Sequence, residues 1–142
     1  MLWGGVFWPF PKLKFAITEG TCAWVPDFVE RLRFFYAESR ESQKLGDFRG
    51  HLAESPVDTF NKNVMIGASC MSRREAEMRH EIGIGNLMWG SDYPALRLLM
   101  PEADWAKAIV EPAEVAQEKG ISFSEEEVAA IMGDNAARLL SL

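Results

Sequence analysis

The sequence predicts an α/β fold in which parallel strands are connected by helices, and three observations lead to this prediction. Three short apolar runs are separated by stretches of helical periodicity, so strands and helices alternate along the chain. Each run is almost continuously apolar, which is typical of parallel strands covered on both faces. Each run also ends in polar residues, and these would meet at the carboxyl edge of a parallel sheet.

The first predicted unit is a strand at Lys12–Thr18 and a helix at Val25–Arg40. The strand is a short apolar run that follows a proline-rich stretch. Pro26 suits the first turn of a helix, and Phe28 and Leu32 fall on one helical face. We expect this helix to pack its apolar face on the sheet, and a polar, glycine-containing stretch to follow it.

The second predicted unit is a strand at Asn63–Ser69 followed by a helix. Ser72 stands three residues before Glu75, and this spacing is that of a capping box, which predicts a helix starting here. Glycine commonly ends helices, so Gly83 or Gly85 should stop it.

The third predicted strand is Asn86–Asp92, and helices make up the tail. Apolar periodicity predicts a helix around residues 105–112 that Pro112 breaks or kinks. Ser124 and Glu127 repeat the capping-box spacing. Residues 133–135 (Gly-Asp-Asn) predict a break and a new N-cap before the last helix.

Three parallel strands alone leave both edges of the sheet open, which is unfavourable for a finished domain. The aromatic segment before the first strand is typical of the end of a helix. Five Trp and nine Phe residues indicate a large buried surface, either an internal core or a partner interface. We therefore expect residues 1–142 to be one unit that forms the last part of a larger domain.

Composition and charge exclude several classes of protein. The chain is 48% hydrophobic and 25% charged, as in ordinary globular domains. Its net charge of −6 argues against nucleic-acid binding, and no apolar run approaches the roughly 18 residues of a membrane span. No signal peptide is recognisable, and Cys22 and Cys70 do not form a disulfide framework. We expect reduced thiols and a cytoplasmic location.

Four segments of the sequence carry a resemblance to a known family. They are GGVFWPFPKLKFAITEGTCAWVPDFVERL, NVMIGAS, IGIGNLMWGSDYP and VAAIMGDNAARLLSL, and they leave out only about Ser39–Pro56. Together they resemble the C-terminal half of the amidohydrolase-related metal-dependent hydrolases, a group that includes aminocarboxymuconate-semialdehyde decarboxylase. The resemblance implies a partial (β/α)8 TIM barrel whose sixth, seventh and eighth strands are the three predicted here. It implies one amidohydrolase-related domain over residues 1–142, C-terminal part only.

The resemblance also implies a metal site. The family binds a divalent metal, usually zinc, through a His-x-His pair on the first strand, a His on the fifth and an Asp on the eighth. Asp92 in GSDYP matches that last ligand, and the alternative is an Asp that caps the following turn. The histidine ligands have no counterpart, because His51 falls in a polar loop and His80 in a predicted helix. A catalytic zinc normally has three protein ligands, so the chain alone should bind zinc weakly.

Four further residues are candidates for catalysis or substrate binding. Glu19 takes the place of the sixth-strand His that the related decarboxylases use as acid/base, or it is a carboxylate at the rim. Ala95 stands where the family often has a second His. Arg73 and Arg74, at a helix start, suit a substrate carboxylate or are simply solvated. Trp24 contacts substrate or packs under the loop.

Three functions remain open at this stage. The first is metal-dependent hydrolysis or non-oxidative decarboxylation of a small carboxylate-bearing substrate, with the chain incomplete and inactive alone. The second is a non-enzymatic half-barrel that pairs with a second copy or a partner chain. The third is metal-free catalysis by Glu19 and Asp92 as paired carboxylates. The expected partners are a small-molecule substrate and either another copy of the chain or the missing N-terminal half, with no nucleic acid and no membrane.

Overall fold

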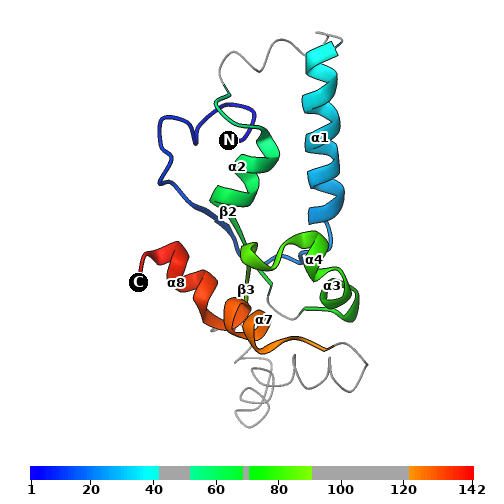
Figure 1. Ribbon diagram of the computed structural model, residues 1–142, viewed down its shortest axis with the longest axis vertical. Coiled ribbons are helices and arrows are strands. Elements are labelled where there is room, and N and C mark those ends of the chain that lie inside the picture. Colours follow the sequence, from blue (N-terminus) through cyan, green and yellow to red (C-terminus); the bar gives the residue numbers. More distant parts are fainter. Residues whose placement is uncertain (42–51, 69–70, 91–121) are drawn as a thin grey trace.

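The structure is a computed structural model, and it describes residues 1–41, 52–68, 71–90 and 122–142. Strands and helices alternate in the described part, as the sequence predicts (Figure 1). The elements are β1 (Phe15–Ile17), α1 (Val25–Glu41), α2 (Pro56–Asn63), β2 (Val64–Gly67), α3 (Arg73–Glu77), α4 (Arg79–Ile82), η2 (Ile84–Asn86), β3 (Leu87–Met88), α7 (Glu125–Ala129), η3 (Ala130–Asp134) and α8 (Asn135–Leu140).

The three strands form one parallel sheet in the order β1-β2-β3. Phe15 is opposite Val64, and Ile66 is opposite Leu87, so the register follows the order of the units along the chain. The predicted α/β class with a parallel sheet is confirmed. Each strand is shorter than its apolar run, and the sheet is open, with β1 and β3 at its two edges.

The main core lies between the helices and one face of the sheet. Ile66 and Leu87 contribute from the strands, and Val25 and Leu32 contribute from α1, as the helical periodicity predicts. Phe60 of α2 is among the largest fully buried side chains. The alternation of side chains along a strand means that these residues share the face turned toward the helices.

The second face of the sheet carries Met65 and Met88, which alternate with the core residues along β2 and β3. Both methionines are buried, yet neither belongs to the main core cluster. Gly67 lies on β2 where a Cβ atom would come within 3.2 Å of the Thr18 Cα atom. A glycine at this position therefore allows β1 and β2 to approach closely just before their carboxyl ends.

Two helices start at the capping boxes that the sequence predicts. Helix α2, in contrast, was not predicted. Ser72 and Ser124 both cap their helices in the predicted manner. Helix α2 begins at Ser55, whose hydroxyl accepts a hydrogen bond from the Asp58 N–H, with Pro56 in the first turn. The helix after Ser72 is divided at Met78 into α3 and α4.

Two local predictions are wrong. Residues 2–9 form consecutive turns rather than the end of a helix. No break occurs at Gly133, because η3 continues α7 as a turn of π-helix into α8. Asp134 makes no side-chain cap, and the Asn135 side chain bonds elsewhere. The predicted helix at 105–112 lies outside the described residues, as do His51, Cys70, Asp92 and Ala95.

Three buried asparagines hold the amino-terminal ends of the strands, and each bonds to the neighbouring unit. The Asn63 Nδ2 atom donates to the carbonyls of Pro11 and Leu13, which precede β1, over 3.2 and 2.7 Å. Asn86 Nδ2 donates in the same way to two carbonyls at the start of β2, those of Asn61 and Val64.

Asn135 of α8 completes the series, because its Nδ2 atom donates to the carbonyls of Ile84 and Leu87, each over 2.7 Å. The asparagine that serves β3 thus comes from a helix, whereas those that serve β1 and β2 directly precede the next strand. Such paired bonds fix the relative height of the units, since each buried amide group satisfies two carbonyls at once.

Among the described helices, none is long and apolar enough to cross a membrane.

Candidate functional site

The carboxyl ends of the three strands lie at one edge of the sheet, where ligand sites of parallel α/β proteins are found. Glu19 follows β1 at this edge, is exposed, and has a φ angle of 60°. A non-glycine residue in this left-handed region is uncommon and costs about 1 kcal/mol. Trp89 leaves β3 at the same edge and leads toward Asp92, which is outside the described residues.

A buried carboxylate connects two loops at this edge. Glu75, only 3% exposed, accepts hydrogen bonds at Oε1 from the backbone N–H groups of Cys22 and Ala23, over 2.5 and 3.0 Å. Its Oε2 accepts from the Ser72 N–H over 2.8 Å. The loop after β1 is therefore fixed to the start of α3. Glu19 lies in that same loop, so Glu75 holds the chain segment that carries it.

The electrostatics of this contact follow from burial and hydrogen bonding. Burial acts to raise the pKa of Glu75, but the bonds from Ser72, Cys22 and Ala23 outweigh it and hold the pKa below its usual value. Burial, followed by the Glu75 charge, raises the pKa of the Cys22 thiol to about 12. Cys22 is therefore a neutral thiol at physiological pH in this fold.

The other residues singled out in the sequence occupy ordinary structural positions. The Trp24 indole N–H donates to the Thr21 carbonyl over 2.7 Å, and its ring meets Phe28 edge-on at 5.5 Å. The Trp24 side chain is thus held by one hydrogen bond and by packing against Phe28. Arg73 pairs with Glu77 one helical turn along α3, over 2.9 Å, and both side chains are largely exposed. Such a pair contributes little to stability.

Arg74 and His80 are exposed, and they lie on α3 and α4 respectively. The His80 Nε2 atom lies 3.2 Å from a carboxylate oxygen of Glu127. The same carboxylate pairs with Arg79, whose guanidinium stacks over the Phe123 ring at 4.7 Å. These contacts attach the C-terminal segment to α4.

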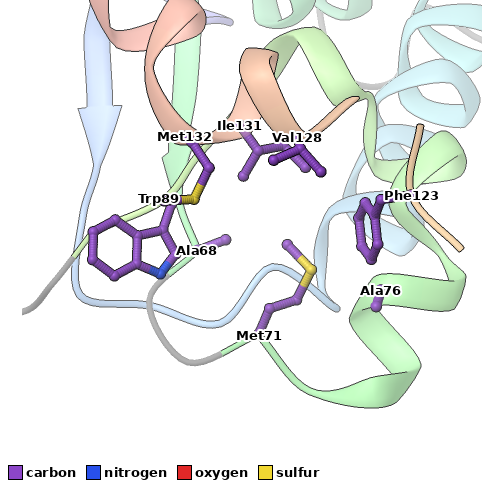
Figure 2. Close-up of a pocket in the computed structure, with 8 residues that line it drawn as sticks. All are labelled: Ala68, Met71, Ala76, Trp89, Phe123, Val128, Ile131 and Met132. Carbon is purple, nitrogen blue, oxygen red and sulfur yellow. The ribbon is translucent and has the colours of Figure 1, made fainter. Parts of the chain in front are cut away.

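A small apolar pocket opens beside the ends of β2 and β3 (Figure 2). Its volume is about 60 Å³, and Figure 2 shows Met71, Trp89, Phe123 and Ile131 around it. Among the described residues, those that line it carry no charge. This part of the pocket therefore suits a hydrocarbon surface.

The described residues do not assemble a ligand set for a metal. No group of three His, Cys, Asp or Glu side chains comes together in the described ranges. Asp92 and His51 fall outside those ranges, and His80 is on the exposed side of α4. The described part of the chain therefore holds no complete metal site.

The residues that organise the two ends of the strands, Glu75 at the carboxyl ends and the asparagines at the amino ends, were not predicted from the sequence. Glu75 was recognised only as half of a capping box, because the same carboxylate group serves Ser72 and the distant loop after β1. The asparagines had a visible signal: Asn63 and Asn86 each stand directly before an apolar strand. A buried polar residue at the start of successive strands indicates a repeated hydrogen-bonding role.

Comparison with known proteins agrees with this geometry. Residues 1–142 match the family described as Amidohydrolase. No curated protein matches the chain. An amidohydrolase from Mycobacterium avium subsp. paratuberculosis is 28% identical with a TM-score of 0.66, and the match covers 99% of this chain and 31% of that one.

Two solved decarboxylases share the fold at lower identity. The 5-carboxyvanillate decarboxylase of Sphingomonas paucimobilis is 24% identical with a TM-score of 0.65, covering 100% of this chain and 38% of that one. A dihydroxybenzoic acid decarboxylase from a Polaromonas species, solved with manganese and 2-nitroresorcinol, is 20% identical with a TM-score of 0.61, covering 99% and 37%. The chain therefore spans little more than a third of these proteins.

Proposed function

This chain belongs to the amidohydrolase family, and from that premise we propose that it contributes the C-terminal part of a metal-dependent hydrolase or non-oxidative decarboxylase. The substrate would be a small molecule that bears a carboxylate. The observation that carries the proposal is the parallel sheet whose carboxyl edge holds Glu19 and leads to Asp92. This is the edge where such sheets place their active sites.

The three strands are proposed to be the sixth, seventh and eighth of a (β/α)8 barrel, within one domain over residues 1–142. Support comes from the match of this chain to 31–38% of the length of the solved relatives. Support also comes from the open sheet, since a barrel strand needs a neighbour on each side. The remaining strands would have to come from elsewhere, and the chain alone should have no activity.

Asp92 is proposed as one ligand of a divalent metal, with the other ligands on the remaining strands. The Polaromonas relative holds manganese, and zinc is the second candidate. When bound, the metal would polarise the substrate and any coordinated water.

The residues of this chain that act on the substrate are proposed to be Glu19 as a catalytic group and Trp24, Arg73 and Arg74 as substrate-binding residues. Glu19 would take up or deliver a proton at its carboxylate. Its strained backbone supports this role, because outliers of this kind cluster at functional sites. The exposed guanidinium of Arg74 can attract a substrate carboxylate, while Arg73 and Trp24 already have partners within the fold.

We further propose a cytoplasmic protein that works with the missing N-terminal part or as a homo-oligomer. The second candidate function is a non-enzymatic half-barrel that serves as an interaction module. Exposed aromatic side chains favour it, among them Trp8, Phe10 and Phe34. Large exposed apolar groups on one small chain indicate a surface that a partner covers.

The proposal is tested by supplying the missing units. The chain is fused behind the portion of the Mycobacterium avium amidohydrolase that it does not match, and metal content and turnover of small aromatic carboxylates are measured. We expect the fusion to bind metal and turn over substrate, and the chain alone to show no turnover.

Variants of the fusion assign the roles. Asp92→Ala should lose both metal and turnover, and Glu19→Gln should keep the metal but lose about 100-fold or more in rate. Asp134→Ala, an exposed carboxylate in the C-terminal helices, is the matched control and should change neither. If Asp92→Ala retains metal and turnover, the proposed site is wrong.

A further inference from the structure

The outer edge of β1 is open in the described structure, and it adjoins a run of exposed apolar side chains. Within the described residues, β1 pairs only with β2. Trp8, Phe10, Leu13 and Phe15 are 58, 61, 39 and 42% exposed, and all four lie in the stretch that leads into and begins β1. An open strand edge beside apolar side chains is a template for pairing with another chain.

The outer edge of β3 differs, because the C-terminal segment already occupies it. The Met88 carbonyl faces β2, where it accepts from Ala68 over 2.7 Å. The backbone N–H and C=O groups of Leu87 and Trp89, on either side of Met88, therefore point away from β2. There, the Trp89 N–H donates to the Ile131 carbonyl over 2.8 Å, and the Leu87 carbonyl accepts from Asn135 over 2.7 Å. These two outward-facing groups, the Trp89 N–H and the Leu87 carbonyl, thus have partners.

Charge decides which partner suits the β1 edge. Lys12 precedes the strand and Glu19 follows it, whereas the Lys14 ammonium group donates to the Lys62 carbonyl over 2.7 Å, on the side of β2. A parallel pair of identical strands would align lysine with lysine and glutamate with glutamate. An antiparallel pair brings Lys12 of one copy beside Glu19 of the other, at both ends of the pair. The edge is therefore complementary to itself under a two-fold axis.

We propose that this chain pairs with a second copy through antiparallel contact of the two β1 edges, and that the Ile131–Asn135 segment keeps β3 from adding a further copy. Assembly then stops at a closed dimer. The remaining barrel units of the proposed function would use the same edge, so the dimer is the state of the chain without them, and this inference rests on the proposed function to that extent.

The apolar side chains are needed for such a dimer. Two strands of three residues bury little surface, whereas stable interfaces bury about 1,200 Å² or more in total. The aromatic stretch before β1, including Trp8 and Phe10, supplies the additional area, because antiparallel pairing places it beside the segment that follows β1 in the second copy. Burial of aromatic side chains is also what distinguishes the energetic centre of an interface from its rim.

Light scattering on the purified chain tests the contact, together with a charge-exchange series. We expect the wild-type chain to be a dimer whose dissociation constant rises several-fold in high salt. Lys12→Glu and Glu19→Lys should each weaken the dimer several-fold, and the combination of the two should restore most of the loss. A wild-type monomer, or a combined variant no better than its parents, overturns the antiparallel pairing.

Two matched asparagine variants test the role of the C-terminal segment. Asn135→Leu removes a contact on the β3 edge, so it should form species larger than a dimer. Asn63→Leu removes the equivalent contact next to β1 and should lower stability without changing the assembly beyond a dimer. If the two variants form assemblies of the same size, the Ile131–Asn135 segment does not limit assembly to a dimer.

Hydrogen exchange at the Trp89 amide in the wild-type chain is a second measurement, and it does not depend on either variant folding. Strong protection of this amide is expected, because it is bonded to Ile131 in each copy. Exchange as fast as in an unfolded chain would show that the edge is not occupied. A monomer in these assays would leave the metal and turnover results of the fusion unaffected, so failure of this inference and of the proposed function are distinguishable.

Discussion

The contact of Glu75 with the loop after β1 predicts a large loss of stability on Glu75→Gln. The carboxylate accepts three backbone N–H bonds, and the amide oxygen of Gln can keep only the side that faces Cys22 and Ala23. The amide NH2 group would then face the Ser72 N–H, which loses its acceptor. One buried donor without a partner and two bonds without charge assistance together cost about 3 kcal/mol.

Urea denaturation followed by tryptophan fluorescence measures this free energy of unfolding. Glu77→Gln is the matched control on the same helix, because Glu77 makes only an exposed pair with Arg73 and should cost about 0.5 kcal/mol or less. If Glu75→Gln is as stable as Glu77→Gln, then Glu75 does not hold the two loops together.

The same contact fixes the direction of the pH dependence. The pKa of Glu75 is lower in the folded chain than its ordinary value of 4.5, so the folded state favours the ionised form. The stability that Glu75 contributes is present above that value and is lost as the pH falls through the folded pKa. The difference between wild type and Glu75→Gln should therefore shrink in acid, whereas a difference that is constant with pH would contradict the assignment.

Three smaller predictions follow from the loops at the carboxyl edge and from α4. Because the pKa of Cys22 is raised to about 12, stability should fall as the pH rises above the thiol's ordinary 9.0, and Cys22→Ala should fall less in urea titrations. Glu19→Gly should be about 1 kcal/mol more stable than Glu19→Ala, since only glycine accepts a φ of 60° without strain. Gly83→Ala, at a φ of 100°, should lower the melting temperature, whereas the same substitution at Gly133 should not.

Patterns that depend on neighbours in the sequence predicted much of the fold. The apolar runs predicted three parallel strands connected by helices, and the serine–glutamate spacings located the starts of α3 and α7. Helix α2 was missed because its apolar positions are few, and its start is recognisable mainly from Ser55 and Pro56. The Ser55–Pro56 pair is a helix-start signal, but the polar character of the preceding stretch led to the prediction of a loop.

Features that depend on distant contacts were not predictable in the same way. Asn135 was expected to cap a helix, yet its amide reaches carbonyls some fifty residues earlier. Glu75 likewise bonds to Cys22 across the edge of the sheet. The strain at Glu19 also has no signal in the sequence, because nothing local requires a left-handed backbone at a glutamate that a glycine follows. The role predicted for Asp92 stays a prediction, since it lies outside the described residues.

We propose that Asp92 is one ligand of a divalent metal site that this chain builds only in part. The decisive experiment is metal analysis of the purified chain, with manganese and zinc titrations of wild type, Asp92→Asn and the control Asp134→Asn. We expect weak, substoichiometric binding that Asp92→Asn abolishes and the control keeps, because a catalytic metal normally needs three protein ligands. Tight binding of one metal ion per chain, unchanged in Asp92→Asn, would show that Asp92 is not a ligand.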